Sequence, residues 1–295
     1  MKEEMKNTDG TREVLFRVTD LHVTYRRPGQ KAVEAVRGVS FDLHAGETLG
    51  IVGESGSGKS TIAKTIMLLQ PSSGGEICFR GKNIASFTSA ERRQYRRDVQ
   101  MVFQDAVGSL NPRMTIRQAL EEILVKSSGG VRGCQDEAET TSGGVRGCQS
   151  PRSLSQTPES LLDIVGLSKA VLDQYPRELS GGQCQRASFA RALAVNPKVL
   201  VADEPVSALD VSVQARILNL MRDLRRELDL AILLIAHDLS VVRNVCDRVC
   251  VMHHGLFEDA GPAEDVFDRP QSDYTKSLLA AVPDVRRSLA ARAQP

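Results

Sequence analysis

The sequence GESGSGKS, residues 53–60, constrains the fold more than any other part of this chain of 295 residues. It fits the pattern G-x-x-x-x-G-K-[ST], in which glycines let consecutive backbone N–H groups curl around a phosphate. The mechanism requires a strand before the loop and a helix after it. A buried run precedes the loop at Glu47–Gly53, and the apolar residues that follow share one helix face, namely Ile62, Ile66 and Leu69. The context therefore favours a phosphate site over a plain glycine-rich turn.

Further apolar runs, alternating with helical patterns, predict a mostly parallel α/β sheet. Buried strands are expected at Asp98–Gln104, Lys198–Pro205, 230–237 and 248–255. Ahead of the phosphate loop, apolar and polar residues alternate as in half-buried antiparallel strands. These segments are Leu15–Val18, Leu21–Tyr25 and Val33–Leu43.

Two acidic residues end the strand predicted at Lys198–Pro205. An acid in this position beside a phosphate loop holds Mg²⁺ through water, which is the role expected of Asp203. Glu204 is then the candidate for orienting and deprotonating an attacking water. Without the loop upstream, the pair would read as a solvated acidic strand end.

A second anion-binding feature lies about 120 residues after the first. Ser180, Gly181 and Gly182 open a helical pattern, and the unpaired N–H groups and dipole of a helix N-terminus attract anions. One domain has no evident use for two phosphate-facing loops so far apart in sequence.

Bulk properties exclude several classes of protein. The formal net charge of +1 gives no overall field for gathering nucleic acid, and the basic stretch Glu91–Asp98 fits a solvated helix. Six scattered cysteines favour a reducing compartment over a disulfide framework. The longest apolar run, 230–236, is too short to cross a bilayer, and the first ten residues lack the apolar core of a secretory signal.

The order of the motifs resembles that of the ATP-binding cassette (ABC) family. GESGSGKS, Gln104 after a strand, LSGGQ, VLVADE, SALD and His237 after a strand follow one another over roughly residues 12–285. The segments QDAVGSLNPRM, GGQCQR, DEPVSALDVSVQA and RPQSDYTKSLLAAVP look like the ATPase subunits of oligopeptide/dipeptide importers, nearest to the second of their two ATPase chains. Ala106–Val107 stands where such relatives often have Pro–Tyr, a departure that would alter the contact with a membrane-subunit helix and leaves the phosphate motifs untouched.

The resemblance implies an α/β fold with a RecA-like mixed sheet core, an N-terminal antiparallel β subdomain and a helical signature subdomain. The expected divisions are a disordered N-terminus at 1–12, the ATPase domain at 13–262 with its helical part at about 105–190, and a C-terminal extension at 263–295. The helical part contains a Gly- and Ser-rich segment, 127–158, in which SGGVRGCQ occurs twice. That segment is predicted to be a flexible insertion.

The same resemblance implies a site for ATP and Mg²⁺. Tyr25 would stack on adenine, Gln104 would touch Mg²⁺ and the lytic water, and His237 would hold the γ-phosphate. The catalytic residues would be Glu204, His237, Gln104 and Lys59, and the Mg²⁺ ligands would be Ser60, Gln104 and, through water, Asp203. The residues expected to contact ATP are Tyr25, Gly53, Glu54, Ser55, Gly56, Ser57, Gly58, Lys59, Ser60, Thr61, Ser180, Gly181, Gly182, Gln183 and Asp210.

In this family two cassettes pack head to tail, so the LSGGQ of one chain meets the phosphate loop of the other. The two distant phosphate-facing loops then belong to one site split between chains. The implied partners are a second ABC ATPase, identical or different, two integral membrane permease subunits and an extracytoplasmic binding protein. The implied location is the cytoplasmic face of the membrane, and the implied work is import of oligopeptides or dipeptides. Import of nickel or another small solute, and a soluble ABC ATPase of DNA repair or translation, are the alternatives.

Overall fold

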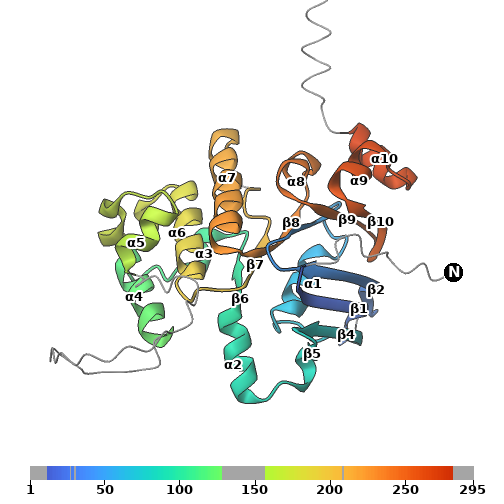
Figure 1. The fold of residues 1–295 in the computed structure, drawn as a ribbon, viewed down its shortest axis with the longest axis horizontal. Helices are drawn as coiled ribbons and strands as arrows, with labels where there is room; N and C mark the ends of the chain where they lie inside the picture. The colour runs from blue at the N-terminus through green and yellow to red at the C-terminus, as the bar shows by residue number, and fades with distance from the viewer. Residues whose placement is uncertain (1–11, 27, 30, 128–156, 208, 282–295) are drawn as a thin grey trace, which may run out of the picture. The chain divides into compact units, whose positions relative to one another are not determined.

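The computed structural model describes residues 12–26, 28–29, 31–127, 157–207 and 209–281, and it divides into two compact units (Figure 1). The first unit is formed by Met1–Asp105 and Pro197–Pro295, and the second by Ala106–Asn196. The predicted N-terminal tail lies outside the described residues up to residue 11. The predicted insertion at 127–158 also lies outside them, apart from its ends, where Ser127 closes one helix and Pro158 opens another.

A six-stranded sheet forms the centre of the first unit, in the order β10-β9-β3-β8-β7-β6. All neighbours are parallel except β10, which pairs antiparallel with β9. The strands are β3 (Thr48–Val52), β6 (Val99–Val102), β7 (Val199–Asp203), β8 (Ala231–Ala236), β9 (Arg248–His253) and β10 (Leu256–Pro262). Because β3, β7 and β8 are buried at every position, their sequences are continuous apolar runs rather than alternating ones. The predicted mostly parallel α/β core is confirmed.

The second sheet is antiparallel, in the order β2-β1-β4-β5. Its strands are β1 (Val14–Tyr25), β2 (Val33–His44), β4 (Gly74–Phe79) and β5 (Lys82–Asn83). The sequence suggested separate strands at Leu15–Val18 and Leu21–Tyr25, but the structure has one long strand across both. Asp20 lies between them with a positive φ of 50°, and the pairing register with β2 shifts between Val18 and Leu21. This irregularity breaks the apolar alternation without ending the strand.

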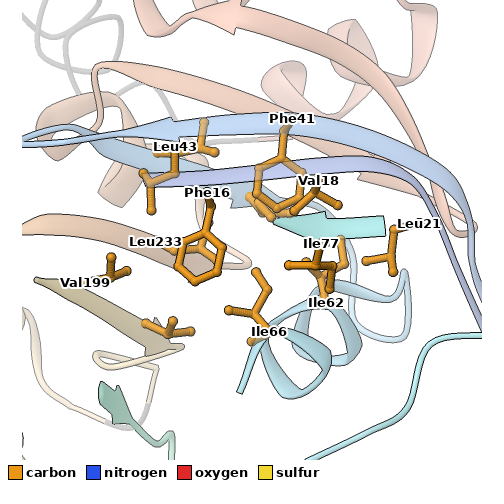
Figure 2. Close-up of a cluster of buried hydrophobic side chains, with 14 of the residues drawn as sticks. Phe16, Val18, Leu21, Phe41, Leu43, Ile62, Ile66, Ile77, Val199 and Leu233 are labelled. Atoms are coloured by element: carbon orange, nitrogen blue, oxygen red, sulfur yellow. The ribbon is translucent and has the colours of Figure 1, made fainter. Parts of the chain in front are cut away.

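The main core of the first unit lies around α1 (Lys59–Ile66), the helix after the phosphate loop. Figure 2 shows side chains of β1 and β2, such as Phe16 and Leu43, gathered with Ile62 and Ile66 of α1 and with Leu233 of β8. Burying each such side chain contributes roughly 1.5–3 kcal/mol. Leu69, expected on the same helix face, lies beyond the helix end and is 61% exposed, so that part of the prediction is wrong.

The other helices of the first unit are η1 (Ile84–Ser86), α2 (Ser89–Asp98), α7 (Val211–Leu228), α8 (Leu239–Val245), α9 (Ala263–Asp268) and α10 (Asp273–Ala280). The Asp210 carboxylate caps α7 by accepting the N–H of Val213 at 2.9 Å. The buried stripe of α7 consists of Ile217, Leu220, Met221 and Leu224. Helices α9 and α10 belong to the predicted C-terminal extension.

The second unit is helical in its described part. Its elements are α3 (Ala106–Ser109), α4 (Ile116–Ser127), α5 (Pro158–Ile164), η2 (Lys169–Asp173), η3 (Pro176–Glu178) and α6 (Gly181–Leu193). Helix α6 carries the LSGGQ motif at its N-terminus and is buried along most of its length. In neither unit does a described helix combine the length and apolar character needed to span a membrane.

Candidate active site

The phosphate loop connects β3 to α1, and two of its glycines admit no side chain. A Cβ on Gly53 would stand 2.0 Å from the carbonyl oxygen of Met252, and one on Gly58 would stand 2.2 Å from that of Ala35. Both residues also have positive φ, at 149° and 112°. The chain around the loop therefore presses against its backbone, and only glycine fits at these two positions.

Gly58→Ala is expected to lower the free energy of unfolding by about 3 kcal/mol or more and to abolish ATP binding, because the added methyl must displace backbone. Gly56→Ala is the matched control. Gly56 also has a positive φ, of 82°, but a Cβ there meets nothing within 4 Å. Gly56→Ala is therefore expected to lower the free energy of unfolding by only about 1 kcal/mol. Denaturant unfolding measures both values. Equal losses would contradict the steric account.

Lys59 joins the two ends of the phosphate loop through hydrogen bonds to its backbone. Its ammonium donates to the carbonyl oxygens of Gly53 at 2.8 Å and Glu54 at 2.7 Å, and the residue is 3% exposed. Burial lowers the pKa of Lys59, whereas the negative charges of Glu204 and Asp203 oppose that change. The ammonium lies at the start of α1, where the first backbone N–H groups have no acceptor within the helix.

Ser60 and Asp203 meet across the ends of α1 and β7. The Ser60 hydroxyl donates to Asp203 Oδ1 at 2.8 Å, and Asp203 is 7% exposed. Burial raises the pKa of Asp203, and the negative charge of Glu204 adds to this, while the hydrogen bond from Ser60 opposes it. A hydroxyl and a carboxylate in contact at this edge of the sheet are hard oxygen donors of the kind Mg²⁺ prefers.

Asp203→Asn is expected to lower ATP turnover at least about 100-fold, because the carboxylate proposed to hold Mg²⁺ is lost. The nucleotide-free protein should nevertheless be as stable as wild type or more stable at pH 7, since a buried charge disappears. A raised pKa means that wild-type stability falls as pH rises from the ordinary value of 3.8 through the folded value. The difference in Tm should therefore shrink as pH is lowered toward 3.8. A variant clearly less stable at pH 7 would contradict this.

Glu204 is the centre of a polar cluster at the ends of three strands. Its backbone N–H donates to the Ile235 carbonyl at 3.0 Å, which continues the β7–β8 ladder, and its φ of 47° turns the chain out of the sheet. Gln104, after β6, donates through Nε2 to Glu204 Oε2 at 3.0 Å. His237, after β8, places Nδ1 3.6 Å from the same oxygen. Gln104 and His237, which the resemblance implies for the site, are thus brought together at the carboxylate of Glu204.

Ser207 is a member of this cluster that sequence reasoning gave no role of its own. Its hydroxyl accepts a second hydrogen bond from Gln104 Nε2 at 3.3 Å and donates to the Glu204 carbonyl at 3.2 Å. The only signal was its place in SALD, one of the ordered motifs that carry the family resemblance. Through these two hydrogen bonds, Ser207 links the Glu204 carbonyl to the Gln104 side chain.

Of the remaining predicted ATP contacts, Tyr25 lies beside the phosphate loop, Asp210 caps α7 in the same unit, and Ser180–Gln183 belong to the second unit. Tyr25, half-buried at the end of β1, places its hydroxyl 3.3 Å from that of Thr61 in the first turn of α1. In the second unit, Ser180 caps α6 through a capping box with Gln183, and Ser180 and Gly181 are exposed. The helix start is therefore at the surface of its own unit, where another molecule can reach it.

The sheet core, the phosphate loop and the acidic strand end together define a nucleotide-binding ATPase. The sequence model described as "ABC transporter" matches residues 36–207, and the chain belongs to the ABC transporter family. It binds nucleotide and is an ATPase. The family resemblance, the fold class and the enzyme class predicted from the sequence are thereby confirmed.

Transport ATP-binding proteins of several bacteria align with most of this chain. The oligopeptide transport ATP-binding protein OppF of Lactococcus lactis subsp. lactis is 46% identical over 86% of this chain and 73% of its own length. The dipeptide transport ATP-binding protein DppF of Lactococcus lactis subsp. cremoris is 44% identical over 90% and 80%, and OppF of Escherichia coli is 40% identical over 94% and 79%.

Solved structures agree with the fold. The dimeric structure of MJ0796, described as a bacterial ABC transporter cassette, superposes with a TM-score of 0.68 at 27% identity, covering 84% of this chain and 98% of that one. A dimeric post-hydrolysis state of the same cassette, bound to ADP and Pi, gives a TM-score of 0.67 at 28% identity over the same shares of the two chains.

Proposed function

We propose that this chain is the ATP-hydrolysing subunit of a membrane importer of oligopeptides or dipeptides. The observation that carries the proposal is the cluster at the strand ends, in which Gln104 and His237 converge on Glu204 beside the Ser60–Asp203 pair. This arrangement would supply a base and a cation site next to the phosphate loop. The cargo follows from the relatives, which are named for oligopeptide and dipeptide transport and align over most of this chain.

Mg²⁺ fits the donors that this site offers. Ser60, Asp203 and Gln104 present oxygen atoms, and Mg²⁺ in ATPases is held by few protein ligands together with substrate phosphates. The ion would neutralise charge on the β- and γ-phosphates.

Hydrolysis would proceed by in-line attack of water on the γ-phosphate, with the protein acting mainly through position and charge. Glu204 would orient the water and accept its proton, and Gln104 and His237 would fix the Glu204 carboxylate and contact the water or phosphate. Lys59 would exchange a loop carbonyl for phosphate oxygens. The alkyl stem of Lys59 is already buried, so little side-chain freedom would be lost on binding.

A complete site would need a second cassette. Ser180 and Gly181 are exposed at the start of α6, whereas Gly182 is buried. We assign the Ser180 side chain and the N–H groups of Gly181 and Gly182 to the γ-phosphate of the ATP held by the opposing subunit. Tyr25 would stack on adenine, and Asp210 would lie at the same seam. ATP then joins the dimer, and loss of the bridging phosphate lets it open. Two permease subunits and an external binding protein would complete the transporter, with this chain at the cytoplasmic face of the membrane.

The test is to delete the gene, measure uptake of labelled di- and oligopeptides, and isolate the tagged protein from membranes. Uptake should fall and return with the wild-type gene but not with Glu204→Gln, and integral membrane proteins should co-purify. Normal peptide uptake together with a loss of nickel uptake would show that the transporter imports nickel rather than peptides. Recovery of ribosomes or nucleic acid without membrane proteins would overturn the importer. The relatives do not favour either alternative.

A further inference from the structure

The C-terminal extension reaches the phosphate loop through one side chain. Tyr274, on α10, accepts the backbone N–H of Glu54 at 3.3 Å, across 220 residues of sequence. Glu54 is the second residue of the loop. The sequence predicted a C-terminal extension at 263–295 without giving it a role, and the extension lies outside the range 36–207 matched by the family model.

The Tyr274 hydroxyl is held in place from two sides. Its ring stacks on His253 at the end of β9, with centroids 3.9 Å apart and planes at 15°. The N-terminus of α10 is fixed by Ser272, whose hydroxyl accepts the Tyr274 N–H at 3.1 Å and whose own N–H donates to the buried Asp259 at 3.0 Å. Both β9 and β10 therefore anchor the side chain that meets the loop.

The same side of the loop has further contacts with β9 and the turn that follows it. Gly255, in that turn, donates its N–H to the Ser57 carbonyl at 2.9 Å, and Met252 O is the atom that forbids a side chain at Gly53. Both backbone polar groups of Glu54 are hydrogen-bonded: Tyr274 accepts its N–H, and Lys59 donates to its carbonyl at 2.7 Å.

We propose that Tyr274 is a positioning residue for nucleotide binding, which pre-forms the phosphate loop from the C-terminal extension. Ordering the loop before the nucleotide arrives lowers the entropic cost of binding. Burial raises the pKa of Tyr274, so the hydroxyl stays neutral near pH 7 and adds no charge that would repel phosphate. The inference rests on the nucleotide role proposed for the loop and goes beyond it by giving the extension a part in ATP affinity.

Tyr274→Phe removes the hydroxyl and keeps the ring on His253. Loss of one hydrogen bond should raise the Kd of the full chain for ADP by about 3- to 10-fold, measured by isothermal titration. Turnover at saturating ATP should stay within about twofold, and hydrogen exchange at the Glu54 amide should become faster. His253→Leu removes the ring that stacks on Tyr274 but leaves the Tyr274 hydroxyl. It should also raise the Kd for ADP, by a smaller factor than Tyr274→Phe.

Thr275→Val is the matched control, because it deletes a hydroxyl at the next position of α10. Thr275 is fully buried, and among the described residues its Oγ1 finds no hydrogen-bond partner. This variant should bind ADP like wild type. Equal affinities for Tyr274→Phe and Thr275→Val would overturn the proposal, as would a loss of affinity accompanied by a Tm drop of more than about 5 °C, which marks a structural role. If wild type itself bound no ADP, the proposed function and not the Tyr274 contact would have failed.

Discussion

Glu204→Gln is expected to lower ATP turnover of the assembled ATPase by about 10²- to 10⁴-fold, the usual contribution of a positioned general base. Glutamine keeps the size of the side chain and an oxygen for the Gln104 amide, which lies 3.0 Å from the carboxylate. MgATP should therefore still bind. Phosphate release measures turnover, and nucleotide retained after gel filtration measures binding.

The same variant should accumulate as an ATP-bound dimer, because the phosphate that joins the two cassettes is no longer removed. Light scattering with saturating MgATP, in the presence of the partner ATPase, gives its mass. Glu227→Gln, which removes one negative charge from the exposed face of α7, is the control and should turn over normally. A Glu204→Gln protein that hydrolyses ATP within tenfold of wild type would show that another group activates the water.

Ser180→Arg is expected to abolish ATP-driven dimerisation and to reduce turnover about 100-fold or more, while ATP still binds the single chain. The arginine side chain would fill the space of the opposing γ-phosphate at the start of α6. The variant also loses the cap that accepts the Gln183 N–H at 3.3 Å, which costs about 1 kcal/mol of stability.

Ser168→Arg separates these two effects. Ser168 is also an exposed N-cap serine in the second unit, and it accepts the Ala170 N–H at the start of η2. Its replacement should cost similar stability and leave dimerisation and turnover unchanged. If both arginine variants dimerised normally with MgATP, Ser180 would not lie at a shared site.

Much of the first unit could be predicted because local sequence patterns indicate its strands and helices and their order. Buried parallel strands give unbroken apolar runs, and the phosphate loop needs glycines at defined points, so β3, β7, β8 and the loop were all expected. Predictions were less accurate where tertiary structure overrides the pattern. Leu69 continues the apolar face of α1 in sequence, yet the helix has already ended at Ile66.

The candidate site shows the same division. Asp203, Glu204 and Lys59 belong to short motifs in which residue type and spacing define the chemical role. The sequence alone therefore identified them. The convergence of Gln104 and His237 on one Glu204 oxygen depends on the strand order β8-β7-β6, which no local pattern contains. The contact between Tyr274 and Glu54 was missed for the same reason: a tyrosine near the end of the chain gives no sign of the loop it reaches.

The most direct test of the split site is a cryo-EM structure of the Glu204→Gln assembly loaded with MgATP. We predict that the γ-phosphate bound by Lys59 of this chain meets the signature helix start of the opposing cassette. The Ser180–Gly182 helix start of this chain should in turn lie within hydrogen-bond distance of the γ-phosphate that the opposing cassette holds. A closed, nucleotide-filled assembly with Ser180 facing solvent, away from every phosphate, would contradict the account.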